Sequence, residues 1–202
     1  MPRPPRTLHL IRQAHRLSGS LLSTIDACGS LSAPLAVSLN RLTPEPTLVL
    51  SSPLSRALST ALDIAGSLEV HAEPLLTEQG TRACDMGRPS SELHQEFRDL
   101  GVKKLAYMGT AWWTSDEADE ALAERVSKLI GKLHLQPHTS LALVSHAAVL
   151  QQLERSLMSS DAAPPPALEP GEVRSVAFPD TRPPAFVLKP FQDQPKEGGN
   201  RL

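Results

Sequence analysis

Three stretches of the chain place a basic side chain after a short run of apolar residues, and together these side chains could bind an anion. Arg12 follows TLHLI, Arg56 comes a few residues after TLVL, and His146 follows LALVS. If the three runs are parallel strands, their carboxyl ends meet at one edge of a sheet, where α/β proteins bind ligands. Two guanidinium groups, an imidazole and the N–H groups of helix N-termini would form an anion site there, and phosphate suits it best.

Taken singly, each of these residues has a simpler explanation. A lone arginine near the end of a strand is usually solvated or engaged in a surface salt bridge, and a lone histidine after a strand is usually structural. Three such groups at three equivalent positions are harder to explain in that way. We therefore expect an anion pocket at the carboxyl edge of the sheet.

The elements that must position these side chains repeat an order of strand, turn and helix. Strands are expected at 7–11, 47–50, 141–144 and 172–178, with one more strand and its exit within 69–78; helices are expected at 33–42, from 53 to about 65, at 90–97, at 116–135 and from about 147. Ser51 or Ser52 is the expected cap of the second helix, and Ser90 or Ser91 begins an expected capping box. Alternating strands and helices predict an α/β fold with a largely parallel sheet.

The composition suits one such domain and excludes several functions. The chain has 202 residues, of which 40% are hydrophobic, and a net charge of −2. It lacks the basic face that wholesale nucleic-acid or membrane binding requires, so any basic site must be local. No segment approaches the roughly 18 apolar residues of a membrane span, and no secretory leader is recognised, so we expect a cytoplasmic protein. Residues 1–178 form the expected domain, and 179–202 an expected flexible, proline-rich tail.

Three motifs, in this order, resemble those of the histidine phosphatase superfamily, the phosphoglycerate mutase-like proteins. The family's Ser-Pro-Leu-x-Arg-Ala motif with a following Thr-Ala matches SSPLSRALSTA at 51–61 and is the most specific of the three. The Ser-His motif matches VSHAAVL at 144–150, and the Arg-His-Ala motif matches residues 12–14 except at Gln13. The stretches LLTEQGTRACDMG at 75–87, AWWTSDEADEALAERV and GEVRSVAF resemble a plant and fungal branch, so the resemblance covers about residues 7–178.

The resemblance implies a fold and a set of roles. The fold is a three-layer α/β/α sandwich around a mostly parallel sheet. Separately, no cluster of residues has the spacing of metal ligands, so we expect neither a metal nor another cofactor. Arg12, Arg56 and His146 would hold the phosphoryl oxygens. Glu78 would protonate the leaving group, with Asp85 as a second candidate for that acid. These roles agree with the physics of phosphoryl transfer, in which positioning, charge stabilisation and a general acid supply the catalysis.

Gln13 stands where the enzymes that this chain resembles carry the histidine that becomes phosphorylated. A neutral imidazole offers a lone pair to phosphorus, whereas the amide nitrogen of glutamine has its lone pair delocalised into the carbonyl. Gln13 can donate a hydrogen bond to phosphate but will not attack it. His15 or His146 would be the substitute nucleophile if one exists, and His15 and Arg16 otherwise add positive potential to the pocket.

Three functions remain open at this stage. The first is a pseudophosphatase that binds a phosphorylated small molecule or a phosphoprotein with little turnover. The second is an active phosphomonoesterase that uses a substitute nucleophile or water. The third is a protein-interaction module with a vestigial pocket. The sequence sets neither the substrate nor the oligomeric state.

Overall fold

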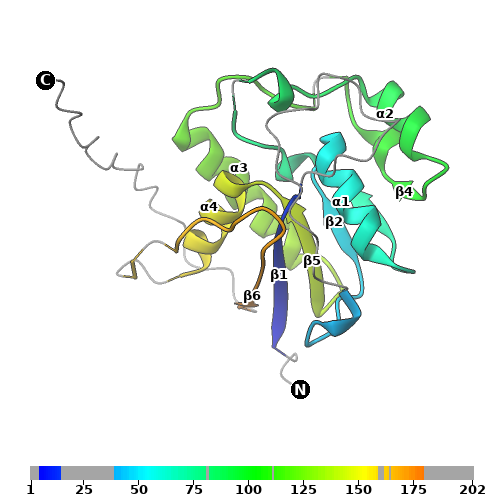
Figure 1. Cartoon of the computed structure of the whole chain (residues 1–202). Coiled ribbons are helices and arrows are strands. Elements are labelled where there is room, and N and C mark those ends of the chain that lie inside the picture. Colours follow the sequence, from blue (N-terminus) through cyan, green and yellow to red (C-terminus); the bar gives the residue numbers. More distant parts are fainter. Residues whose placement is uncertain are drawn as a thin grey trace, which may run out of the picture.

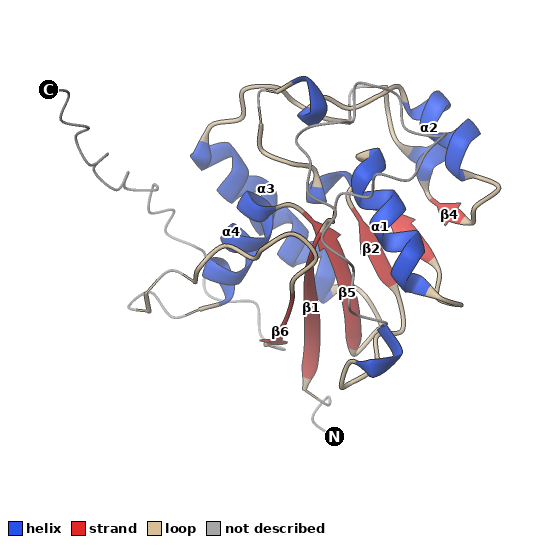
Figure 2. Cartoon of the chain, in the orientation of Figure 1, coloured by secondary structure: helices blue, strands red, loops and turns tan. Residues whose placement is uncertain are grey.

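The fold has three layers, two pairs of helices on either side of a six-stranded sheet (Figure 1, Figure 2). The computed structural model describes residues 5–14, 39–80, 82–110, 112–158, 162–163 and 165–179. The strands are β1 (Arg6–Arg12), β2 (Val49–Ser51), β3 (Val70–Ala72), β4 (Val102–Lys103), β5 (Ser140–Ser145) and β6 (Val173–Phe178). The helices are α1 (Ser55–Ala65), α2 (Ser90–Phe97), α3 (Asp119–His134) and α4 (Ala147–Leu157).

The sheet has the strand order β4-β3-β2-β5-β1-β6, so β5 lies between β2 and β1. All pairs are parallel except β1 with β6, which is antiparallel. The predicted α/β fold with a mostly parallel sheet is therefore confirmed. This order matters for function because it brings the carboxyl ends of β1, β5 and β2 side by side.

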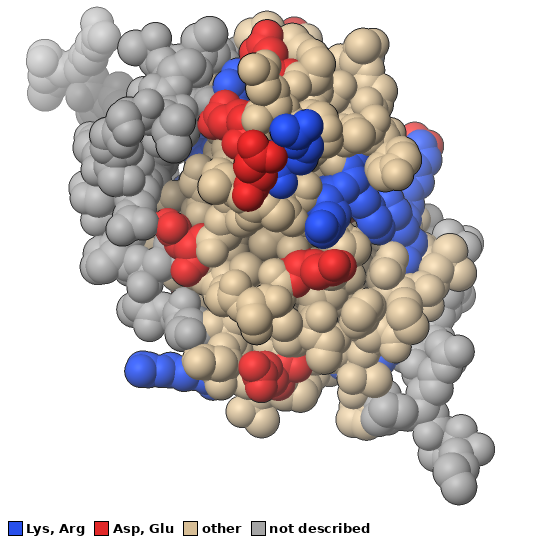
Figure 3. Space-filling view, turned by 90° about the vertical axis from the view of Figure 1, so that its right-hand side faces the viewer, with Lys and Arg blue, Asp and Glu red and all other residues tan. Residues whose placement is uncertain are grey.

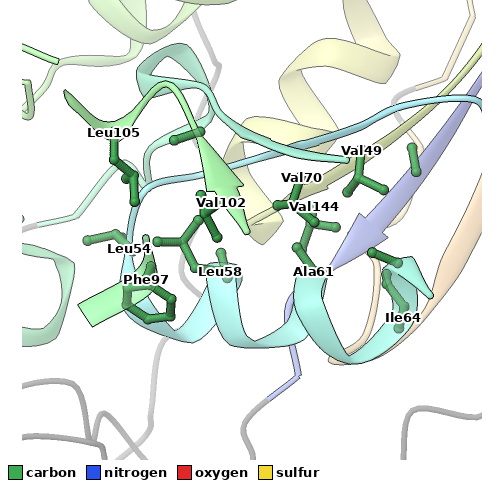
Figure 4. Close-up of a cluster of buried hydrophobic side chains, with 14 of the residues drawn as sticks. Val49, Leu54, Leu58, Ala61, Ile64, Val70, Phe97, Val102, Leu105 and Val144 are labelled. Carbon is green, nitrogen blue, oxygen red and sulfur yellow. The ribbon is translucent and has the colours of Figure 1, made fainter. Parts of the chain in front are cut away.

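The pleat of the central strand divides the core into two clusters. Leu141 and Leu143 of β5 face α3 and α4, whereas Ala142 and Val144 face α1 and α2. Figure 4 shows the second face, where Leu54, Leu58 and Ala61 of the α1 region pack against the sheet. A strand that is buried on both faces consists of consecutive apolar residues, and for this reason the central strands are recognisable in the sequence.

The helix starts depart from the predicted caps. Helix α1 begins at Ser55 and not at Pro53, and its N-cap residue is Leu54, without a side-chain cap bond. The predicted capping box of α2 is also absent, because Pro89 is its N-cap residue. Helix α3 begins at Asp119, three residues after the predicted start. The predicted end of α1 is confirmed, since Gly66 is its C-cap residue with a positive φ of 58°.

Other differences concern short or edge elements. Of the helix expected over 33–42, residues 33–38 lie outside the described part, and Leu39–Arg41 forms one turn of 3₁₀ helix. Strand β4 has only two residues and was not predicted. The boundary of the predicted tail cannot be compared, because residues 180–202 lie outside the described part; β6 ends at Phe178. Among the described residues, no helix is both long and apolar enough to cross a membrane.

Candidate active site

The ends of the three central strands bring the predicted site residues together. Arg12 is the last residue of β1 and lies opposite Ser145, the last residue of β5. Beyond the strands, the backbone N–H of Gln13 donates to the carbonyl of Ser145 at 2.8 Å. On the other side of β5, the N–H of Ser52 donates to the carbonyl of Val144 at 2.9 Å. His146 therefore leaves β5 between the first and second motifs, as the sequence analysis expected.

His146 is completely buried at the centre of the site. Its Nε2 lies 2.9 Å from the hydroxyl oxygen of Ser52. Its Nδ1 lies 3.4 Å from Nη2 of Arg56 and 3.6 Å from Oε2 of Glu78. The imidazole thus lies between the hydroxyl group of Ser52 on one side and the side chains of Arg56 and Glu78 on the other. These contacts set its orientation.

Arg56 lies in the first turn of α1 and is buried. Its Nη2 donates to Oδ1 of Asp85 at 2.9 Å, and its Nη1 donates to the carbonyl of Cys84. The other oxygen of Asp85 accepts from Nε of Arg82 at 3.2 Å. Asp85 itself is buried, so its carboxylate balances the charge of Arg56 and aligns the guanidinium.

Glu78 is the carboxyl group nearest to His146. Its side chain is only 13% exposed. Burial raises the pKa of Glu78 from 4.5 to about 7, with the negative charge of Asp85 acting in the same direction and the charges of Arg56 and Arg12 opposing both. A carboxyl group with this pKa holds its proton for much of the time near neutral pH, as a general acid must.

The first motif forms the remaining wall of the site. Gln13 is buried, and its Oε1 has no hydrogen-bond partner among the described residues. Nη1 of Arg12 donates to the carbonyl of Leu168 at 2.6 Å, and its buried Nε has no hydrogen-bond partner there. The backbone N–H and carbonyl of Ala14 both bond to Oγ1 of Thr60 on α1, at 3.2 and 3.0 Å. The motif is therefore fixed from α1, while one polar atom each of Arg12 and Gln13 is buried without a partner among the described residues.

Five predicted residues meet in one place, whereas two others cannot be placed. Arg12, Gln13, Arg56, Glu78 and His146 surround the ends of β1, β5 and β2. Asp85 is a partner of Arg56 in this structure, so its geometry favours Glu78 as the acid. His15 and Arg16, the accessory candidates, lie outside the described residues.

Sequence reasoning missed several residues that support the site. Ser52 contacts His146 and also accepts from the N–H of Leu54 at 3.3 Å, and its place in SSPLSRA was a signal for the first contact. Thr60, which fixes Ala14, belongs to the same motif. Leu168 contributes only its carbonyl, for which no sequence signal exists.

One side of the molecule carries charges of both signs. Figure 3 looks onto the right-hand side of Figure 1, where Lys and Arg side chains form one dense patch, with smaller basic groups and scattered Asp and Glu side chains elsewhere on the face. Among the described residues, no three His, Cys, Asp or Glu side chains lie together so as to hold a metal ion.

This fold and site define an α/β protein with arginine and histidine side chains gathered at the ends of the central strands. The family model of the histidine phosphatase superfamily (branch 1) matches residues 33–185, and the chain belongs to this superfamily. No curated protein sequence matches the chain.

Solved structures of phosphatases share the fold. An Escherichia coli K-12 protein assigned as an alpha-ribazole-5'-P phosphatase is 25% identical, with a TM-score of 0.54 over 86% of this chain and 91% of its own. The alpha-ribazole phosphatase of Shigella flexneri is 24% identical, with a TM-score of 0.51 over 84% and 89%. A mycobacterial glucosyl-3-phosphoglycerate phosphatase is 18% identical, with a TM-score of 0.51 over 84% and 89%.

Proposed function

We propose that this chain binds a phosphorylated ligand at the Arg12, Arg56 and His146 pocket and turns it over poorly, as a pseudophosphatase. The phosphoryl oxygens would be held by the guanidinium groups of Arg12 and Arg56 and by the imidazole. The ligand is a phosphomonoester, either a small molecule or a phosphoprotein. The plant and fungal branch of the family and a cytoplasmic location remain predictions of the sequence analysis.

The observation that carries this proposal is the position of Gln13. Its backbone N–H bonds to the carbonyl of Ser145, the residue before His146, and its side chain is buried. In the enzymes that the chain resembles, the residue at this position forms the phosphohistidine. The amide nitrogen of Gln13 has no free lone pair with which to attack phosphorus, but it carries two N–H donors for phosphoryl oxygens. Because Oε1 of Gln13 has no partner within the described part of the chain, the side-chain amide can be flipped, and its N–H donors then take the place of Oε1.

A second candidate function, a working phosphomonoesterase, is favoured by Glu78. Its pKa of about 7 is what a general acid needs, and a binding site alone has no use for it. In this case His146 or a water molecule would attack phosphorus. The contacts of His146 Nε2 with Ser52 and of its Nδ1 with Arg56 hold the ring in one orientation, which weighs against His146 as the nucleophile.

Hydrolysis of p-nitrophenyl phosphate by the wild type and by Gln13→His tests the proposal. Gln95→His, an exposed glutamine on α2, is the matched control. We expect no turnover from the wild type or the control, and a gain of at least about a hundredfold in Gln13→His, because the missing nucleophile is restored. Ordinary turnover by the wild type would overturn the proposal in favour of the active phosphomonoesterase.

Binding of inorganic phosphate, measured by calorimetry, tests the other half of the proposal. We expect the wild type to bind phosphate and Arg12→Ala to bind at least about tenfold more weakly, because a charge-assisted hydrogen bond is lost. Arg98→Ala removes an exposed arginine paired with Asp99 and serves as the control. A wild type that binds no phosphate would contradict the proposal and support an interaction module with a vestigial pocket.

A further inference from the structure

The segment that carries Glu78 is held by polar contacts from two other elements. The three backbone carbonyls of residues 75–77 each accept a hydrogen bond from a side chain outside the segment. Nη1 of Arg125, on α3, donates to the first and third of these carbonyls at 2.8 Å each. Oγ of Ser145, at the end of β5, donates to the middle one at 2.6 Å. The backbone leading into Glu78 is therefore fixed from both the helix and the sheet.

Arg125 is itself held in a defined orientation. Its Nε and Nη2 donate to the two carboxylate oxygens of Glu117 at 2.7 and 2.5 Å. The two side chains are only 16% and 10% exposed. A bidentate, largely buried pair of this kind restricts the guanidinium far more than a single surface contact does. All three nitrogens of Arg125 are engaged, and Nη1 is aimed at the Glu78 segment.

The residue after Glu78 is held to the same part of the molecule. Nε2 of Gln79 donates to the carbonyl of Glu117 at 3.0 Å and to Oδ1 of Asp119 at 2.8 Å. The chain is thus attached to residues 117–125 on both sides of Glu78, through backbone carbonyls before it and through the side chain of Gln79 after it. None of these contacts involves the phosphate-binding side chains, so they form a separate support for the acid.

We infer that Arg125 is a positioning residue that clamps residues 75–79 onto α3 and so keeps the Glu78 carboxyl group buried against His146. The inference rests on the proposed role of Glu78 as the acid, but it does not depend on which group attacks phosphorus. The hydrogen bonds of Arg125 go to Glu117 and to the backbone of residues 75 and 77, and not to Arg12, Arg56 or His146. It acts through the backbone of the segment that presents the acid.

The clamp has a measurable effect because burial is the main cause of the proton affinity of Glu78. The charged groups that face Glu78 are Arg12 at the end of β1, Arg56 on α1, Asp85 after the 77–82 loop, and His146 when protonated. Loss of the clamp leaves these groups in place but lets the carboxyl group turn toward water. The pKa of Glu78 would then fall from about 7 toward its ordinary value of 4.5.

Titration of the full chain by NMR, with ¹³C-labelled glutamate carboxyl groups, tests this inference. The signal of Glu78 is assigned by its disappearance in Glu78→Gln. We expect a midpoint near pH 7 in the wild type and a midpoint lower by at least about one unit in Arg125→Met. Arg125→Lys keeps the charge but not the fork and should fall between the two. Lys128→Met, an exposed position on the same helix paired with Glu124, should titrate like the wild type.

The outcomes separate the clamp from the role of Glu78. A wild-type midpoint near 4.5 would overturn the role of Glu78 as the acid, and the clamp with it. A wild-type midpoint near 7 that Arg125→Met leaves unchanged would overturn the clamp alone. If Arg125→Met does not fold, Glu117→Gln and Gln79→Ala replace it, and an unchanged midpoint in both would overturn the clamp.

Discussion

At the scale of single residues, the site depends on buried charges that are compensated by named partners. Arg56 and Asp85 are both buried, and each supplies the charge that the other requires. Removing one member of such a pair leaves a buried charge without its counter-charge, which costs more than the pair contributes when intact. The geometry of the proposed phosphate site and the stability of the domain are therefore linked through Arg56.

We expect Arg56→Met to lower the free energy of unfolding by about 3 kcal/mol, because the carboxylate of Asp85 remains buried while Arg82, which still pairs with it, is exposed. The double variant Arg56→Met/Asp85→Leu should recover part of this loss. Urea denaturation of the two variants and the wild type measures both effects. A double variant less stable than Arg56→Met would show that Asp85 is not the source of the cost.

The raised pKa of Glu78 predicts a pH dependence of stability. In the folded protein Glu78 binds its proton up to about pH 7, whereas in the unfolded chain it releases the proton near 4.5. The folded state binds more protons in this window, so the contribution of Glu78 to stability falls as pH rises from 4.5 to 7. At about 1.4 kcal/mol per pKa unit, the total change is about 3 kcal/mol.

Glu78→Gln removes this titration. The variant should gain about 2–3 kcal/mol of unfolding free energy relative to the wild type between pH 5 and pH 8. Urea denaturation across this pH range measures the difference in unfolding free energy. The contributions of the other titrating groups are the same in both proteins and cancel in this difference. A constant difference at every pH would show that Glu78 titrates in the same range whether the chain is folded or not.

At the scale of elements, the loop between β3 and α2 matters most, because it supplies both Glu78 and Asp85. Gly80 lies against Asp85, and a Cβ atom at this position would be 2.2 Å from Oδ2 of Asp85. The carboxylate cannot stay where it is if that space is filled. A side chain at Gly80 would thus disturb the alignment of Arg56 without changing any charge.

Gly80→Ala should therefore weaken phosphate binding by about tenfold, or about 1.4 kcal/mol. Gly109→Ala is the matched control, because a Cβ atom at Gly109 would meet nothing within 4 Å. Calorimetric titration with inorganic phosphate compares the two variants with the wild type. Equal affinities in all three would mean that the loop accommodates the methyl group without moving Asp85.

The strands that position the site were predictable, whereas the loop that completes it was not. β1, β2 and β5 are apolar runs buried on both faces, and their ends carry Arg12, the second motif and His146. The 77–88 loop has no periodic pattern, so the pairing of Asp85 with Arg56 depends on tertiary contacts that sequence does not reveal. The predicted cap of α1 is wrong because the N-cap residue is Leu54. Ser52 lies before it, and its hydroxyl oxygen accepts from the N–H of Leu54 and contacts His146.

At the scale of the whole molecule, the domain closes at β6. This antiparallel strand pairs with β1 over its full length and ends at Phe178, whose side chain is buried. Arg174 of β6 also pairs with Glu154 of α4 at 2.7 Å. Strand β6 is therefore attached both to the sheet and to α4, whereas the predicted domain boundary at residue 178 remains a prediction.

A chain that ends at residue 179 should keep the unfolding free energy of the full chain within about 0.5 kcal/mol and the same phosphate affinity, since the described core contacts are all retained. A chain that ends at residue 171 lacks β6 and should not fold. Urea denaturation and calorimetry compare the three lengths. A marked loss of stability in the chain ending at 179 would contradict the assignment of residues 179–202 as a tail.

The central claim is that Gln13 has removed the nucleophile from an otherwise complete phosphate site. Intact-mass spectrometry tests it most directly: the wild type and Gln13→His are incubated with p-nitrophenyl phosphate, quenched, and compared for one added phosphoryl group. The account predicts a phosphorylated Gln13→His protein, with the phosphoryl group on the introduced histidine, and an unmodified wild type. A wild type that carries a phosphoryl group on His146 or another residue of the site would contradict it.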